Sequence, residues 1–413
     1  MGPRIIAPEV KPDTLLAWIA ALFLAACLFS HTVALRLLLL AAGIVLASIT
    51  IARDRHGIKA LPPIWLPFLL WGLWAAASIA WSVEPDRSEK EWRNEVFYTA
   101  AALWVCYVGA QVRNARQVFA GILAAAALAA CLIGLWEYTR GPGRYPVGLH
   151  GGSGNHSSAL IILMPCVLMI AWYAARNGRA AWLVACALAL GAVFFAAAYT
   201  TLNRTVWIAF AVQFVLLGAL LLRRMPHRSR LMRPIAWSLA VLSACAIMVA
   251  SIQVERQGIG NVNTFEGDSR LALWPEVLEH IGERPFGGYG FGRGVLRGPL
   301  QEKLGEVDKY LWHAHNLFLE ALIQTGIPGL LLLVGLLGAT VLAGWRNTRD
   351  PDDWIAACGM ALLAVLVGTV VRNMTDTLLV RQNALLYWGM AGALLGFARR
   401  GRAPADDPKA RSG

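Results

Sequence analysis

Charge is what this sequence has little of. Only 15% of its 413 residues are Asp, Glu, Lys or Arg, whereas a soluble domain carries roughly a quarter. Hydrophobic residues make up 57% of the chain, and the mean hydropathy is +0.54. This composition excludes an ordinary soluble domain and indicates an integral membrane protein.

The chain also lacks the alternating polar and apolar segments of about 10 residues that a membrane β-barrel needs. Its apolar runs instead approach the roughly 20 residues with which an α-helix crosses the hydrocarbon core. We therefore predict an all-α polytopic membrane protein, a single membrane domain (residues 1–413) with about 12 transmembrane helices. The predicted spans are 15–30, 32–52, 64–82, 95–112, 117–138, 158–175, 180–200, 205–222, 234–252, 316–345, 354–371 and 381–398.

Lys and Arg are unevenly distributed between the segments that join these spans. With the N-terminus placed inside, the inner segments hold 21 Lys and Arg, whereas the longer outer loops hold 15. Positive charge marks the cytoplasmic side, so both termini are predicted to be cytoplasmic in a bacterial inner membrane. The inner segments also hold 8 acidic residues. The excess of Lys and Arg over acidic residues in these segments accounts for the net charge of +12. The basicity therefore reflects topology, and no nucleic-acid partner is predicted.

The predicted outer loops contain no cysteine. This absence excludes a disulfide framework and a cysteine metal site on that side of the membrane. All seven cysteines lie within predicted spans: Cys27, Cys106, Cys131, Cys166, Cys186, Cys245 and Cys358.

One extramembrane segment, 253–315, is long enough to cover a site, and we predict it as a periplasmic loop containing short helices. Apolar residues recur at helical spacing from Leu271 to Ile281, which places Arg270 at the start of a helix. Ser269 or Asp268 would cap that helix. The glycine-rich stretch 285–292 follows no strand and opens no βαβ unit, so it predicts a tight loop rather than a dinucleotide site.

His313 and His315 stand at the outer end of the span that follows this loop. A histidine at a helix end on the membrane surface can serve as a general base. The alternative is an interfacial histidine bonded to a backbone carbonyl. The two histidines are expected on different sides of a helix, so they do not predict a two-histidine metal site.

Arg204 lies in a tight outer turn between two spans, where it has almost no loop in which to move. A guanidinium fixed in this way can bind a phosphate with two hydrogen bonds. The alternative is a side chain that reaches out to lipid headgroups.

Together these residues resemble the O-antigen ligase and polymerase superfamily of bacterial membrane glycosyltransferases. The resemblance depends on the order of the motifs and on their common outer side. Arg204 in a short turn is followed by Ser-Arg-x-x-x-Trp in the long loop, then by Pro-Phe-Gly-Gly-Tyr-Gly-Phe-Gly at 285–292, and then by His-Asn-Leu-Phe-Leu-Glu entering the next span at His315.

The resemblance implies transfer of an O-antigen polysaccharide from undecaprenyl pyrophosphate to a hydroxyl of lipid A–core oligosaccharide at the periplasmic face. In this scheme His315 is the general base, and Arg204 and Arg270 bind the pyrophosphate and stabilise the charge of the leaving group. Backside attack predicts inversion at the anomeric carbon. With two guanidinium groups on the diphosphate, no metal and no cofactor is expected.

Several further residues are candidates for supporting roles in the same site. Asp376 could orient His315 or hold an acceptor sugar, and helix capping is its structural alternative. Arg140 and Arg144 lie in an outer loop where they could contact glycan or lipid A phosphates. The whole supporting set comprises His313, Asn316, Arg372, Asp376, Arg140 and Arg144.

Three alternative functions remain open from the sequence. A polymerase of O-antigen or exopolysaccharide and a protein O-oligosaccharyltransferase belong to the same superfamily and differ in their acceptor. From another class, a transporter or flippase of lipid-linked sugars would place its polar groups near the middle of the bilayer. Here the polar residues gather at one surface instead, which favours an enzyme.

Overall fold

The computed structural model describes residues 12–54, 57–140, 150–178, 181–224, 243–245, 247–249, 269–298 and 313–401. Within these ranges the chain is helical and contains no β-strand, as expected for an all-α membrane protein. The elements are α1 (Pro12–Ala26), α2 (Val33–Arg53), α3 (Trp65–Ala77), η1 (Ser78–Trp81), α4 (Pro85–Trp92), η2 (Arg93–Phe97), α5 (Tyr98–Gly109), α6 (Ala115–Arg140), α7 (Ser153–Arg176), α8 (Ala181–Thr200), α9 (Arg204–Arg224), α12 (Ser269–Glu283), η3 (Arg293–Leu296), α14 (Leu317–Thr348), α15 (Asp353–Arg372) and α16 (Arg381–Gly401).

Seven of the described helices are long and apolar enough to cross a membrane: α2, α6, α7, α8, α9, α14 and α15. Eleven of the twelve predicted spans coincide with described helices, but α1 and the stretch Trp65–Trp81 are shorter than a full crossing. Most of the predicted span 234–252 lies outside the described residues. The polytopic helical class is therefore confirmed, while the count of twelve remains a prediction.

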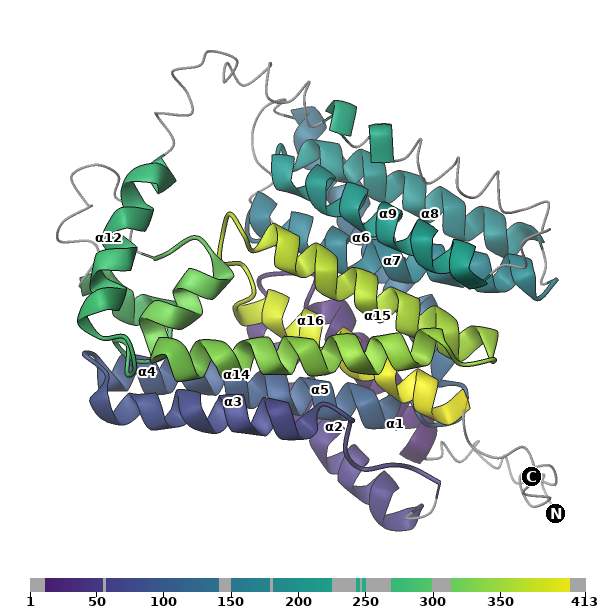
Figure 1. Cartoon of the computed structure of the whole chain (residues 1–413). Helices are drawn as coiled ribbons and strands as arrows, with labels where there is room; N and C mark the ends of the chain where they lie inside the picture. Colours follow the sequence, from purple (N-terminus) through teal and green to yellow (C-terminus); the bar gives the residue numbers. More distant parts are fainter. Residues whose placement is uncertain are drawn as a thin grey trace.

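The C-terminal helices form the centre of the bundle (Figure 1). α15 lies between α14 on one side and α7 and α9 on the other, and α16 packs along α5. α6 to α9 cover one flank of this centre and α1 to α5 the other. A buried amide joins three of these helices, because Gln213 on α9 donates to the carbonyls of Ile161 and Ala364, at 2.9 Å each.

The helix ends fall into two groups at opposite ends of the bundle. At one end Asp353 pairs with Arg176 at 2.6 Å and with Arg224 at 2.9 Å, while Arg400 bonds the carbonyl of Val112. These residues belong to segments predicted to be cytoplasmic. At the other end Leu317 N–H donates to the carbonyl of Asn373. This bond joins the start of α14 to the end of α15, next to two segments predicted to be periplasmic. The contacts thus group the segments as the charge distribution predicts.

α14 is broken near its start, at the end of the bundle opposite Asp353. Gly326 has a φ of 69°, outside the helical region, and Pro328 follows it. Proline has no N–H, so the carbonyl of Gln324 loses its partner within the helix. The N–H of Ile327 donates instead to the carbonyl of Pro285, at 2.8 Å. The carbonyl of Ile323 therefore also has no partner within the helix.

The glycine-rich stretch 285–292 satisfies both of these carbonyls. Tyr289 N–H donates to the carbonyl of Ile323 at 3.0 Å, and Gly290 N–H donates to that of Gln324 at 2.9 Å. The predicted tight loop is confirmed. Its glycines are required by the close approach, because a Cβ on Gly288 would lie 2.4 Å from the backbone of Gln324.

We expect Gly288→Ala to lower the apparent melting temperature of the detergent-solubilised protein by a few degrees. Gly288 has a φ of 65°, which disfavours any side chain, and the added methyl group meets backbone rather than a flexible side chain. Gly338→Ala is the matched control, because a Cβ there meets nothing within 4 Å. Thermal unfolding followed by size-exclusion chromatography measures both variants; equal melting temperatures would contradict the proposed packing.

Candidate active site

His315 lies in the short segment between the long loop and α14, and its conformation is unusual. Its φ is +50°, a left-handed backbone that costs a residue other than glycine free energy. Asn316 caps α14 immediately after it, accepting hydrogen bonds from the N–H groups of Phe318 at 3.0 Å and Leu319 at 3.1 Å. Both histidines therefore precede the helix. The expectation that they lie on different sides of a helix is wrong, because the helix begins only at Leu317.

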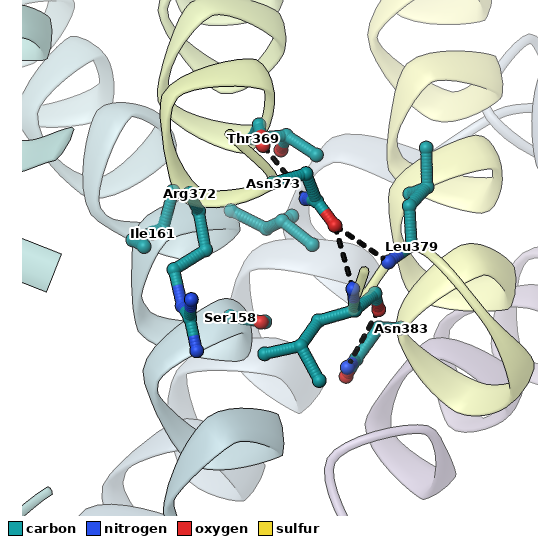
Figure 2. Close-up of a pocket in the computed structure, with 9 residues that line it drawn as sticks. Ser158, Ile161, Thr369, Arg372, Asn373, Leu379 and Asn383 are labelled. Atoms are coloured by element: carbon teal, nitrogen blue, oxygen red, sulfur yellow. Dashed lines mark hydrogen bonds between the residues drawn. The ribbon is translucent and has the colours of Figure 1, made fainter. Parts of the chain in front are cut away.

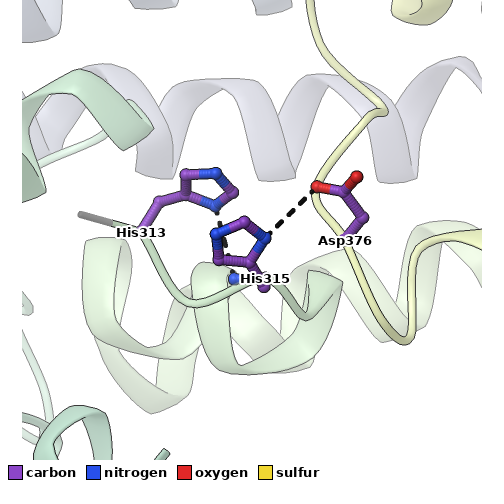
Figure 3. A group of neighbouring side chains, drawn as sticks. All are labelled: His313, His315 and Asp376. Carbon is purple, nitrogen blue, oxygen red and sulfur yellow. Dashed lines mark hydrogen bonds and ion pairs between the residues drawn. The ribbon is translucent and has the colours of Figure 1, made fainter. Parts of the chain in front are cut away.

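The rings of His313 and His315 are stacked, with their centroids 3.8 Å apart and their planes inclined by 25° (Figure 3). Nδ1 of His315 lies 3.5 Å from Oδ1 of Asp376, and neither ring nitrogen of His315 has a hydrogen-bond partner among the described residues. An imidazole whose Nδ1–H faces a carboxylate carries its free lone pair on Nε2. This is the arrangement that a general base requires.

Asp376 comes from the turn between α15 and α16, and it stays ionised in this setting. Burial alone would raise the pKa of its carboxyl group. The adjacent His315 and the guanidinium group of Arg372 outweigh that effect and hold the pKa well below its usual range. Nη2 of Arg372 lies 3.6 Å from Oδ2 of Asp376. The predicted pair Arg372 and Asp376 therefore lies directly behind the candidate base.

His313 is held by α14 itself. Its Nδ1 accepts from the N–H of His315 at 3.3 Å and lies 3.8 Å from the carboxylate of Glu320. Burial lowers the pKa of His313 although Glu320 opposes this, so the ring is neutral at neutral pH. A neutral neighbour imposes no charge repulsion when His315 takes up a proton.

His313, His315 and Asp376 form the single group of potential metal ligands among the described residues, with their donor atoms all within 4.8 Å of one another. The stacked rings argue against a shared ion. A ring nitrogen binds a metal in the plane of its ring, and two nearly parallel planes 3.8 Å apart direct their lone pairs side by side. The geometry therefore fits a base and its carboxylate partner better than a metal centre.

A series of polar contacts runs from His315 to the turn that carries Arg204. Beyond Asp376, Nε of Arg372 lies 3.5 Å from Oγ of Ser157, which in turn lies 3.5 Å from Nδ2 of Asn203. Asn203 accepts from Thr205 N–H at 3.1 Å, and α9 begins at Arg204. The predicted tight turn is thus confirmed, and Arg204, half-buried, forms no hydrogen bond or ion pair with a described residue.

Arg270 opens α12, as its sequence pattern predicts. Its side chain lies outside the described part of the structure. The helix is nevertheless anchored to the site, because Trp274 Nε1–H donates to the carbonyl of Ala314 at 3.1 Å. Leu273 and Val277 of α12 are buried with Ala314 against α14. Arg270 therefore stands one helical turn from the residue that contacts the backbone preceding His315.

The structure does not bring the predicted residue Arg140 to His315. Arg140 is exposed at the end of α6, where its guanidinium carbon lies 4.0 Å from the ring centroid of Trp136. Arg144 lies outside the described residues.

Sequence reasoning missed two residues that shape the site. Glu320 accepts from the N–H of Ala314 at 2.7 Å and from Gln324 at 2.8 Å, so it holds the segment that carries both histidines. Asn373 accepts from the N–H groups of Leu378 at 2.7 Å and Leu379 at 2.9 Å, which folds the turn containing Asp376 (Figure 2). A polar side chain within an apolar span was the signal for Glu320.

A small cavity of about 10 Å³ is lined by Arg372, Ser158, Thr369 and Asn383 among others. Figure 2 shows these residues. The cavity has about the space of a single water molecule. It provides room for hydration of the buried guanidinium group but not for a substrate.

Comparison with known proteins finds a family that one segment of the chain matches. Residues 192–334 match the family described as O-antigen ligase. This segment contains Arg204, Arg270 and His315, so the resemblance inferred from the sequence is confirmed there. The ComP-specific O-oligosaccharyltransferase of Acinetobacter baylyi is similar, with 25% identity over 160 residues, which is 37% of this chain and 28% of that protein. The match thus spans little more than a quarter of the relative's length.

Removal of the cap at Asn316 tests how the site is held. We expect Asn316→Ala to cost about 1 kcal/mol of stability and to lower any transfer activity, because the amide of Asn316 also donates to the carbonyl of Met374 at 3.1 Å. Asp352→Ala is the matched control, since Asp352 caps α15 with two equivalent hydrogen bonds at the opposite end of the bundle. Thermal stability and transfer assays compare the two, and an equal loss of activity in both would contradict a local role.

Proposed function

We propose that this protein is an O-antigen ligase that acts at the periplasmic face of the inner membrane. It transfers a glycan from undecaprenyl pyrophosphate to a hydroxyl group of lipid A–core oligosaccharide. The observation that carries the proposal is the contact, at 3.5 Å, between His315, which lies within the family match, and Asp376. A carboxylate behind one ring nitrogen leaves the other to act on substrate.

The chemistry follows from these groups. A sugar hydroxyl is a weak nucleophile, so Nε2 of His315 takes its proton as the oxygen attacks the anomeric carbon. The bond from that carbon to the pyrophosphate breaks on the opposite face, which inverts the configuration. Negative charge grows on the leaving pyrophosphate, where Arg204 and Arg270 stabilise it.

Asp376 has a distinct part in this scheme. Its carboxylate keeps the proton of His315 on Nδ1 and stabilises the imidazolium ion that forms during the transfer. Arg372, which is buried, compensates the charge of Asp376 and joins it to Ser157 on α7. Arg372 is therefore a positioning residue.

A second candidate function is transfer of the glycan to a protein. It is favoured by the relative from Acinetobacter baylyi, which is named as a ComP-specific O-oligosaccharyltransferase. The base and the arginines would act in the same way with either acceptor, because both offer a hydroxyl group. The two functions differ only in the molecule that supplies it.

The proposal is tested by incubating the purified protein with an undecaprenyl-pyrophosphate glycan and lipid A–core, with and without EDTA. We expect product in both conditions, and a loss of about 10²- to 10⁴-fold in His315→Ala. His31→Ala is the control, because His31 lies in the turn between α1 and α2. Product that disappears with EDTA contradicts the metal-independent mechanism, and full activity in His315→Ala contradicts the base.

Parallel reactions with other acceptors separate the functions. A serine-containing pilin peptide tests the protein acceptor, and free lipid-linked repeat units test polymerisation. Product with lipid A–core alone supports the ligase. Product with either of the others, and none with lipid A–core, transfers the assignment to that function.

Asp376→Asn removes the negative charge beside His315. Because the pKa of Asp376 is held well below its usual range, its carboxylate is ionised at pH 8. The variant should therefore lose activity about tenfold or more at that pH, as for a lost charged hydrogen-bond partner. Initial rates of the variant and of the unmodified protein at pH 8 measure this loss. Equal rates would contradict the proposed role of the carboxylate.

A further inference from the structure

A large apolar cavity lies between helices on one side of the bundle, and one end of it reaches the basic segments. Its volume is about 630 Å³, within the range of pockets that hold whole ligands. Five helices bound it: α6, α7, α8, α15 and α16. Its walls are almost entirely apolar, and Phe194, Leu163 and Leu394 form part of them.

The cavity opens towards the surroundings of the bundle rather than into its core. Gly121 and Ala124 of α6 and Cys186 of α8 line it and are exposed. In the bilayer this surface faces lipid chains. Arg116, Trp182 and Trp354 line its end, and each stands at or next to the start of a helix that begins on the predicted cytoplasmic side.

Positive charge is concentrated at that end. The guanidinium carbon of Arg116 lies 4.5 Å from the ring centroid of Trp354, and Arg116 forms no hydrogen bond or ion pair with any residue that the structure describes. Burial, together with the charges of Arg116 and Arg113, lowers the pKa of Arg400, so three guanidinium groups are close enough to repel one another.

Two neighbouring carboxylates have other partners than Arg116. Asp353 is already paired with Arg176 at 2.6 Å and with Arg224 at 2.9 Å. Asp352 caps α15 through the N–H groups of Trp354 and Ile355. An anion placed beside Arg116 would therefore relieve repulsion that the protein itself leaves in place.

An apolar cavity with a cationic end complements one kind of molecule, an amphiphile with an anionic head and a long hydrocarbon chain. We propose that the cavity binds an anionic phospholipid of the phosphatidylglycerol type, with an acyl chain between α6 and α8 and its phosphate at Arg116. Anionic lipids of the cytoplasmic leaflet are drawn to Lys and Arg at that surface. This site is separate from the proposed transfer reaction and does not depend on it.

The test is native mass spectrometry of the purified full-length chain titrated with phosphatidylglycerol or with phosphatidylcholine of identical acyl chains. Gly121→Phe fills the cavity, because a Cβ at Gly121 meets nothing within 4 Å. Gly338→Phe is the matched control, since a Cβ there also meets nothing within 4 Å and Gly338 lies on α14, away from the cavity. Arg116→Gln removes the charge and leaves the cavity open.

We expect one phosphatidylglycerol to bind preferentially over phosphatidylcholine and to be lost in Gly121→Phe but not in Gly338→Phe. Arg116→Gln should weaken phosphatidylglycerol binding about tenfold and leave phosphatidylcholine unchanged, as for a lost charge-assisted contact. Equal binding of the two lipids by the unmodified protein overturns the proposal. So does full phosphatidylglycerol occupancy in a folded Gly121→Phe, or an Arg116→Gln variant with undiminished preference.

Discussion

The candidate site depends on the joining of two turns that are far apart in the sequence. The N–H of Leu317 donates to the carbonyl of Asn373 at 2.8 Å, and the amide of Asn316 donates to the carbonyl of Met374 at 3.1 Å. These bonds fix the start of α14 against the end of α15. Without them His315 and Asp376 would belong to two independent loops, and their side chains would have no common geometry.

Each turn is also stabilised from within by a polar side chain. Glu320 holds the segment that precedes α14, and Asn373 folds the turn that follows α15. Their partners are backbone N–H groups, which lose hydrogen bonds to water near a membrane and must find others in the protein. The positive φ of His315 is maintained by this surrounding network, as expected for strain at a functional position.

Much of this arrangement could be predicted from the sequence. Apolar runs located nearly every described helix, and the charge distribution grouped the helix ends correctly, because both signals are local and strong. The motif residues Arg204, Arg270 and His315 were identified by their order. The stacking of His313 and His315 was not predicted, since both residues precede the cap at Asn316 and no helical periodicity relates them. Nor were the contacts of Glu320 and Asn373 predicted, because their backbone partners, although only 5 or 6 residues away, are set by the conformation of the two turns and not by helical spacing.

The break in α14 has a mechanical consequence. Residues 317–325 are tied to the turns around His315, whereas the longer part after Pro328 runs through the bundle. Two helical segments joined at an interrupted hydrogen-bond ladder bend at the joint instead of moving as one rod. Changes in bilayer thickness tilt transmembrane helices. We expect the joint at Gly326 to let the long segment tilt while the short one keeps its place, so that the geometry of the candidate site is preserved when the bilayer changes thickness.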